Sequence, residues 1–404
     1  MRILFLSRRY FPAISGMSIY AQNLLRELVA QGHDVTMISQ YRDDDFGKRV
    51  YGGGPPPLVP GVRVVGLPQT GEARDGDFEE DIETMKAAML TEHEAAPFDV
   101  FHAQYGYPTG WAALLAGQEA GVPVVVSIQG GDGHWVGDCC ECHRLAMVRV
   151  LDHADRVLIG GESFAREVHE RLGTPMGRFT YVPGAVDTTR FTPGKRDPGA
   201  PLGLLYHGRV DARKGALDTL ETLARLDTKR AWRATISGIG PDLDAAKALS
   251  AQLSLDDRVT FTGYADYADV PAIYRAHQVF LSPTYAEGFS NTILEAMASG
   301  HAVLAGRSVG VVDCVRDGEN GVLIEPGDIE GVAAALARLI DHDEERERLA
   351  AAALAECRET YSWERAGRLI AAEYEAVAGG AGPSGVEPAL PRDPCRFRRE
   401  PHLL

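Results

Sequence analysis

Short apolar runs alternate with segments of helical apolar spacing along the first third of the chain. Residues 2–7 form an almost continuous apolar run of strand length, and residues 19–30 carry apolar side chains three and four positions apart. Gly32 ends this predicted helix, and another apolar run follows at 35–39. The order strand, loop, helix, strand is the unit of a parallel sheet. Further strands are predicted at 62–67, 100–103 and 122–128, and a further helix at 111–120.

The same pattern restarts after residue 200. A strand is predicted at 202–206, a helix at 216–226 after a glycine-containing loop, and a returning strand at 233–237. The fold class is therefore α/β, with two doubly wound parallel-sheet, Rossmann-like domains. Later strands at 259–261, 279–282, 302–305 and 321–324 alternate with helices.

The length of the chain also indicates two domains, because 404 residues are too many for one hydrophobic core. Proline and glycine gather at 187–201, so we place the boundary there and predict domains at 1–190 and 191–362. A terminal helix is predicted at 363–378, and we expect it to pack back on the first domain. Residues 380–404 are rich in Gly, Pro and Arg with few apolar positions, which predicts a mobile tail.

Charge and cysteine content exclude several classes of protein. A net charge of −16 and an isoelectric point near 5.2 give nucleic acid or an anionic bilayer no electrostatic reason to bind the whole surface. The first apolar run is too short for a signal peptide or a membrane span, so we expect a cytoplasmic protein. Six cysteines do not resemble a secreted disulfide framework, and we expect reduced thiols.

Two carboxylates eight positions apart, Glu287 and Glu295, carry the strongest local signal. The second lies in a predicted helix for which Ser290 or Asn291 is a natural N-cap. Amides at that helix start, with the backbone of Gly288 and Phe289, can donate to phosphate or sugar oxygens. Two alternatives stay open: Thr292 and Glu295 match a capping box, and Glu287 is equally suited to be a solvated loop acid.

A basic cluster at 207–215 follows a predicted strand and precedes a helix, where a doubly wound sheet holds ligands. Arg209 and Lys214 can there neutralise the charge that develops on a departing diphosphate. A basic surface loop is the alternative. Gly238 and Gly240 end another strand and permit close approach of a ligand, but they do not complete the dinucleotide fingerprint G-x-G-x-x-G.

These motifs, taken in order, resemble the retaining nucleotide-sugar glycosyltransferases of the GT-B fold, specifically glycosyltransferase family four. The resemblance covers the chain up to about residue 377 and implies two domains facing across a cleft. The motifs are the early loop with Gly16, residues 99–102 and 182–187, Gly208-Arg209 with Lys214-Gly215, Gly238-Ile239-Gly240, and the pair Glu287 and Glu295.

The resemblance also implies roles for single residues. Arg209 and Lys214 would hold the donor diphosphate, Gly16 would approach it from the other domain, and Glu295 would bind the ribose hydroxyls. The nucleobase would lie near Tyr264. The transferred sugar would be held by the donor-binding turn Glu287, Gly288, Phe289 and Ser290, which continues into Asn291 and Thr292. No metal or cofactor is implied, and transfer retains the anomeric configuration while a donor phosphate oxygen helps to remove the acceptor proton.

His102 would face the cleft by the same resemblance, although a lone histidine at a strand end is often structural. Two departures concern the acceptor side. Gln129 stands where many family members have histidine, so a titratable group is replaced by an amide. Gly184-Ala185 replaces the usual Asn-Gly.

The segment 132–143 is peculiar to this chain. We interpret it as an acceptor-side loop, with Asp132, His134 and Trp135 as candidate contacts. Buried reduced thiols are the alternative for its cysteines. A zinc site is a third interpretation, but the spacing is not that of a standard finger, and no second Cys or His pair follows at a useful distance. The zinc ligands would be Cys139, Cys142, His143 and His134.

The sequence as a whole predicts a retaining glycosyltransferase that moves a hexose-type sugar from a UDP- or GDP-sugar to a small soluble acceptor. A role in antibiotic or other specialised metabolism is one interpretation. We expect a monomer or homodimer without nucleic acid or a stable membrane partner. The alternatives are a sugar-nucleotide epimerase or phosphorylase on the same fold and a non-catalytic sugar-nucleotide binder.

Overall fold

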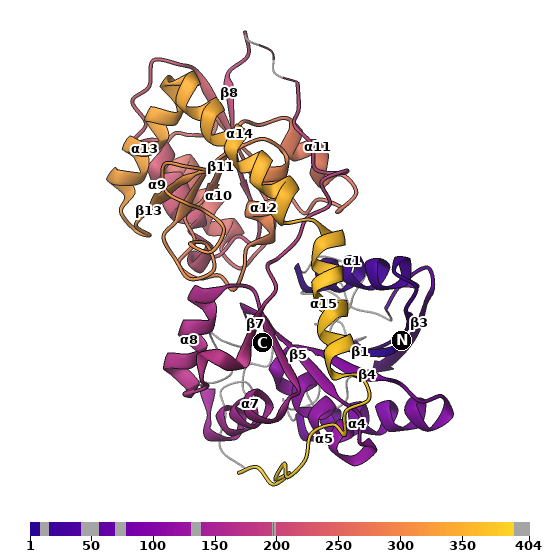
Figure 1. Ribbon diagram of the computed structural model, residues 1–404. Helices are drawn as coiled ribbons and strands as arrows, with labels where there is room; N and C mark the ends of the chain where they lie inside the picture. Colours follow the sequence, from indigo (N-terminus) through magenta and orange to yellow (C-terminus); the bar gives the residue numbers. More distant parts are fainter. Residues whose placement is uncertain are drawn as a thin grey trace. The chain divides into compact units, whose positions relative to one another are not determined.

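The protein divides into two compact units, each with its own parallel sheet. The computed structural model describes residues 1–8, 16–41, 56–68, 78–130, 139–195, 197 and 199–391 (Figure 1). Unit 1 consists of Met1–Pro183 and Trp363–Leu404, and unit 2 of Gly184–Ser362. The prediction of two α/β domains, each with a parallel sheet, is confirmed.

Unit 1 is built on a seven-stranded sheet in the order β3-β2-β1-β4-β5-β6-β7. All neighbouring pairs are parallel, and the order reverses direction between β1 and β4. The central strands are buried almost throughout and mostly apolar, because helices cover both faces of such a sheet. The strands are β1 (Arg2–Arg8), β2 (Asp34–Tyr41), β3 (Val62–Pro68), β4 (Val100–Gln104), β5 (Val124–Ile128), β6 (Arg156–Ile159) and β7 (Phe179–Tyr181).

The helices of unit 1 follow the strands in sequence and close with the last helix of the chain. This last helix, α15 (Trp363–Val377), packs against α1 (Gly16–Ala30), where the Trp363 ring meets the Tyr20 ring edge to face at 5.2 Å. Within the described ranges the others are α4 (Phe78–Ala95), the short helix η1 (Gly106–Gly110), α5 (Trp111–Ala120), α7 (Glu141–His153), α8 (Glu162–Leu172) and the short helix η3 (Met176–Arg178).

Unit 2 repeats the plan with six parallel strands in the order β10-β9-β8-β11-β12-β13. Its order reverses direction between β8 and β11, and two apolar cores lie against the sheet. Ligands of doubly wound sheets bind beyond the carboxyl ends of the strands at such a reversal. The strands are β8 (Leu202–His207), β9 (Trp232–Ser237), β10 (Val259–Gly263), β11 (Val279–Ser282), β12 (Ala302–Gly306) and β13 (Val322–Ile324).

Six α-helices and one short helix complete the description of unit 2 (Figure 1). They are η4 (Ala212–Lys214), α9 (Ala216–Ala224), α10 (Leu243–Gln252), α11 (Val270–Arg275), α12 (Asn291–Ala298), α13 (Ile329–Asp341) and α14 (Asp343–Thr360). None of the helices within the described ranges is long and apolar enough to span a bilayer.

Two boundaries differ from the sequence-based expectations. The change of unit falls at Pro183 rather than at 190/191, because the following residues pack into unit 2: Phe191 is fully buried in its core, and Val186 forms a bridge with Ser362. A proline-rich stretch predicts a loop, but it does not show which of the two cores the neighbouring residues pack into.

The last described residues also differ from the mobile tail predicted at 380–404. Val386 is only 4% exposed, and its backbone N–H and C=O both bond the Gln118 side chain of α5. Arg149 of α7 donates to the carbonyls of Glu387 and Ala389. Residues 380–391 therefore lie on unit 1, because side chains of α5 and α7 satisfy their backbone groups despite the low apolar content. Residues 392–404 lie outside the described part of the chain.

Candidate functional site

A nearly buried carboxylate organises the loop that follows β8. Asp211 is the N-cap of η4, and its Oδ1 accepts a hydrogen bond from the Lys214 backbone N–H at 3.0 Å. Its Oδ2 lies 3.1 Å from Arg209 Nε and 3.4 Å from Arg213 Nη2, and its side chain is only 7% exposed. One carboxylate therefore holds three basic residues in a single short loop.

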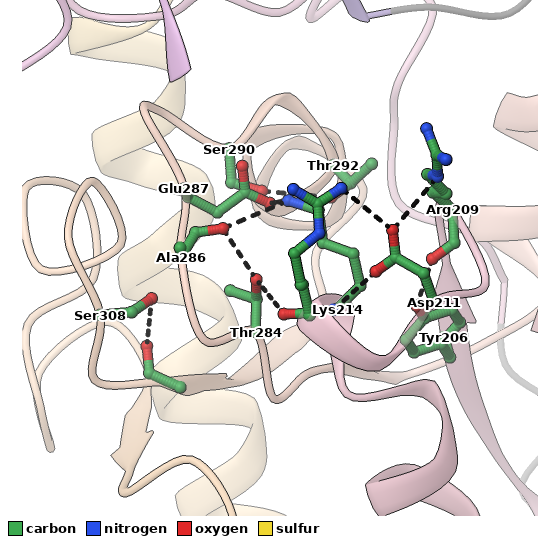
Figure 2. A network of polar contacts seen from close by, with 12 residues as sticks. Tyr206, Arg209, Asp211, Lys214, Thr284, Ala286, Glu287, Ser290, Thr292 and Ser308 are labelled. Carbon is green, nitrogen blue, oxygen red and sulfur yellow. Dashed lines mark hydrogen bonds and ion pairs between the residues drawn. The ribbon is translucent and has the colours of Figure 1, made fainter. Parts of the chain in front are cut away.

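Lys214 links this loop to the one that follows β11. Its Nζ lies 2.5 Å from Glu287 Oε1 and 3.4 Å from the Ala286 carbonyl oxygen. Figure 2 shows Lys214 between the two loops, with Asp211 and Arg209 on one side and Glu287 and Ser290 on the other. Both side chains of the ion pair are largely buried, at 29% and 18% exposure, while Arg209 is half exposed. The arrangement brings the cations Arg209 and Lys214, each paired with a carboxylate, to the carboxyl edge of the sheet.

Backbone hydrogen bonds join the loops that follow β8, β9 and β10. Gly208 N–H donates to the Ser237 carbonyl at 3.0 Å, and Gly238 N–H donates to the Gly263 carbonyl at 2.9 Å. A Cβ on Gly238 would overlap the Gly208 carbonyl, and one on Gly240 would overlap the Val210 carbonyl. These two glycines thus permit the loop after β9 to approach the loop after β8 closely. Their predicted contact with a ligand stays a prediction. Tyr264, which follows Gly263, is 43% exposed.

The turn after Glu287 leads into α12. Ser290 is the N-cap and makes no side-chain cap hydrogen bond, although its Oγ lies 3.2 Å from Thr292 Oγ1. The helix begins at Asn291, so Thr292 lies inside it and the predicted capping box does not form. First-turn amides of α12 therefore remain available to an anion. Phe289 instead packs within unit 2: its ring lies 5.8 Å from that of Tyr361, and a Cβ on Gly184 would meet it at 2.6 Å.

Glu295 is a buried carboxyl group with a single aromatic partner among the described residues. Tyr274 donates its hydroxyl to Glu295 Oε2 at 3.0 Å and also lies 3.2 Å from the Thr292 carbonyl oxygen. Burial raises the pKa of Glu295 to about 8, against the opposing effects of the Tyr274 hydrogen bond and the Arg190 charge. At neutral pH the protonated form of this acid is therefore well populated.

His102, which the resemblance would turn toward a cleft, is a core residue of unit 1. It is fully buried in β4, with Nδ1 at 2.5 Å from Tyr374 Oη and Nε2 at 2.7 Å from Ser127 Oγ. Burial lowers its pKa to about 3. The assignment of His102 as a catalytic residue is corrected, because both ring nitrogens are bonded inside the core. The strand-end position alone did not reveal that α15 supplies a partner.

Gln129 and Gly16, both in unit 1, are connected through a buried side chain. Gln104 Nε2 donates to Gln129 Oε1 at 3.2 Å and to the Met17 carbonyl at 3.1 Å, next to Gly16 at the start of α1. Ser7 donates its hydroxyl to Gln104 Oε1 at 2.7 Å. Side chains at the carboxyl ends of β1 and β4 thus position Gln129 and the start of α1, where Gly16 lies. The candidate acceptor contacts Asp132, His134 and Trp135 lie outside the described residues.

Three organising residues were not among the predicted site residues. Asp211 had a detectable signal, since an aspartate three positions before Lys214 is a typical N-cap of a short turn. Tyr274 and Gln104 had none, because their partners are distant in sequence. Gly288 is the remaining predicted donor residue, and its carbonyl lies against Gly310.

Comparison with curated proteins finds similarity over nearly the whole chain. Glycogen synthase of Mycobacterium tuberculosis is 26% identical over 97% of this chain and 98% of its own length. A D-inositol 3-phosphate glycosyltransferase of Geodermatophilus obscurus is 29% identical over 90% of this chain and 85% of its own.

Solved structures with the same fold include sucrose-phosphate synthase from Thermosynechococcus elongatus, with a TM-score of 0.77 and 21% identity over 93% of this chain and 98% of that one. The Anabaena protein HepE, solved in complex with UDP-glucose, has a TM-score of 0.72 and 17% identity over 93% and 100%. Both similarities establish the fold.

Family models match both halves of the chain. The glycosyl transferase 4-like domain matches residues 15–185, and glycosyl transferases group 1 matches residues 190–355. The chain therefore belongs to glycosyltransferase family four, the group 1 glycosyl transferases, and is a glycosyltransferase of the GT-B fold.

Proposed function

We propose that this glycosyltransferase moves a hexose-type sugar from a UDP- or GDP-sugar to a small soluble acceptor, with retention of the anomeric configuration. The observation that carries the proposal is the Lys214–Glu287 ion pair of 2.5 Å beside the Asp211–Arg209 pair. Cations for a diphosphate and a carboxylate for sugar hydroxyls meet there at one edge of the sheet. The UDP-glucose complex of HepE supports the same donor class.

The cations serve the leaving group. As the bond between the anomeric carbon and the phosphate oxygen breaks, negative charge grows on the diphosphate. Arg209 and Lys214 would stabilise this charge by contacts that strengthen in the transition state. A charge-assisted hydrogen bond contributes about 1.5–3 kcal/mol in general. Asp211 and Glu287 hold the two cations in place before the donor arrives, which reduces the ordering cost of binding.

Retention requires attack on the face from which the diphosphate departs. The acceptor oxygen forms the new bond to the anomeric carbon, the phosphate leaves with the electron pair, and a donor phosphate oxygen takes the acceptor proton. This route needs no titratable protein base, which agrees with glutamine at position 129 and with a His102 whose nitrogens are both bonded. Membership of the family favours transfer over the epimerase and phosphorylase alternatives. The paired cations Arg209 and Lys214 favour an enzyme over a non-catalytic binder, because a binder need not stabilise a leaving group.

The proposed acceptor is small and polar. The relatives named as D-inositol 3-phosphate glycosyltransferases act on such a compound, and the net charge of −16 opposes anionic surfaces. We place the reaction in the cytoplasm and in antibiotic or other specialised metabolism, with the enzyme as a monomer or homodimer.

Replacing Arg209 by alanine should lower turnover by about 10²–10³-fold, because it removes a charge that acts on the departing diphosphate. Steady-state kinetics with a sugar nucleotide checks this. The matched control is Arg225→Ala, which removes an exposed arginine paired with Glu330 and should change turnover little. Equal turnover of Arg209→Ala and the unmodified enzyme would contradict the assigned role.

Replacing Glu295 by glutamine should flatten the pH dependence of stability. Between its ordinary pKa of 4.5 and its folded pKa of about 8, the folded protein holds more protons on Glu295 than the unfolded chain does. The free energy of unfolding therefore falls as pH rises through this window, by at most about 1.4 kcal/mol per pH unit from this group. Denaturant unfolding between pH 5 and 8 measures the slope. The exposed control Glu330→Gln should keep the slope, and an unchanged slope in Glu295→Gln would refute the buried-acid description.

Sugar transfer should continue in the presence of EDTA, because Arg209 and Lys214 replace the metal that many transferases use to bind diphosphate. Adding Mg²⁺ or Mn²⁺ after chelation should change the initial rate less than about twofold. A product assay with chelated enzyme tests both statements. A rate that appears only with one of these ions would show that the diphosphate is held through a metal.

A further inference from the structure

Two thiols and one imidazole meet at the start of α7 in unit 1. The side chains are Cys139, Cys140 and His143, and their potential ligand atoms all lie within 4.8 Å of one another. We propose that these three residues bind one zinc ion per chain. The three residues belong to unit 1, whereas Lys214 and Glu287 belong to unit 2, and the proposal does not depend on the proposed function.

The separation of the two sulfur atoms fits zinc coordination. Cys139 Sγ and Cys140 Sγ are 3.8 Å apart. Two thiolates bonded to one tetrahedral zinc at about 2.3 Å are separated by about 3.8 Å. The two adjacent cysteines thus have the spacing of a ligand pair before any ion is bound.

His143 supplies the third ligand atom. Its Nδ1 lies 2.8 Å from Cys139 Sγ, so one proton is shared between them. Zinc would replace that proton and lengthen the contact to about 3.6 Å, the distance between tetrahedral sulfur and nitrogen ligands. Cys139 is only partly buried and can turn its side chain to do so. Binding makes both thiols thiolates and releases their two protons to solvent, and a water completes the fourth position.

The imidazole is held in the orientation that coordination needs. His143 is 4% exposed, and its ring lies 4.3 Å from that of Tyr107 and 5.8 Å from that of Phe78. Cys140 is the N-cap of α7 and His143 is its third residue, positions whose side chains face each other in a capping box. Helix geometry thus brings these two ligands together, and the helix dipole favours negative thiolates at this end.

The ligand set differs from the one that spacing alone suggested. Cys142 is buried and is not part of the three-residue group, and His134 lies outside the described residues. A zinc ion on Cys139, Cys140 and His143 would fix residues 139–140 to the first turn of α7. Its role is to hold this segment in place, and the diphosphate chemistry does not use it.

Titration of the full-length, reduced and chelator-treated protein with Co²⁺ tests the site. We expect one equivalent to produce thiolate-to-cobalt charge-transfer absorption and visible bands of tetrahedral cobalt. One equivalent of Zn²⁺ should abolish both. Cobalt binding without thiolate charge transfer, or no binding by the folded protein, would overturn the proposal.

Variants identify the ligands in the same titration. Cys139→Ser and Cys140→Ser should each weaken Zn²⁺ binding by more than about 100-fold, beyond the loss typical of residues that only support a ligand. The matched control is Cys142→Ala, which removes the neighbouring buried thiol and should leave the affinity within about threefold. Circular dichroism confirms that each variant is folded. Undiminished affinity in both serine variants, or loss in Cys142→Ala, would contradict the assigned ligand set.

Discussion

The Lys214 ammonium, through its ion pair with Glu287, ties together the loops that follow β8 and β11 at the centre of the candidate site. Strands β8 and β11 are direct neighbours in the sheet of unit 2, with Leu204 opposite Val279. The loops that follow them are also joined at the Arg213 carbonyl oxygen, which accepts a hydrogen bond from the Tyr285 N–H at 2.9 Å and from the Thr284 hydroxyl at 3.3 Å. Because Asp211 anchors the Lys214 backbone from the other side, the position of the cation is determined at both ends of the residue.

The buried polar residues Glu295 in unit 2 and His102 in unit 1 have different roles. In unit 2 the Tyr274–Glu295 contact lies beside the start of α12. Burial raises the pKa of Glu295 to about 8, so its charge changes near neutral pH. In unit 1 the hydrogen bonds of His102 join β4 to β5 and α15, and burial lowers the pKa of its imidazole to about 3. Glu295 lies close to the backbone amides at the start of α12, and this position suits a role in ligand binding. His102 has a partner on each ring nitrogen, and this arrangement suits a structural role.

The fold could be predicted from the sequence because buried parallel strands are short, continuous apolar runs. The strands near Arg2–Arg8 and Leu202–His207 were both located by this pattern. The pattern did not show which core the loop and tail residues join, because tertiary contacts determine this. Val386 is anchored by Gln118, and Phe191 belongs to the core of unit 2, although composition marks both segments as loop or tail.

The candidate site was predictable in its residue types more than in its contacts. Glu287 was singled out by its spacing from Glu295 and Lys214 by its place in a basic loop between a strand and a helix, and the structure brings the two side chains together. Asp211 and Tyr274 became visible only through their partners, and His102 proved to be a core residue. Gly238 shows the same limit, since the need for glycine arises from the Gly208 carbonyl.

The most direct test of the account is calorimetric binding of UDP, GDP and the corresponding monophosphates to the unmodified enzyme and to Lys214→Met. The account predicts that at least one diphosphate binds about tenfold or more tightly than its monophosphate, and that the substitution removes most of this difference. Equal affinity of the variant and the unmodified enzyme for the preferred diphosphate, or no binding of either diphosphate, would contradict it.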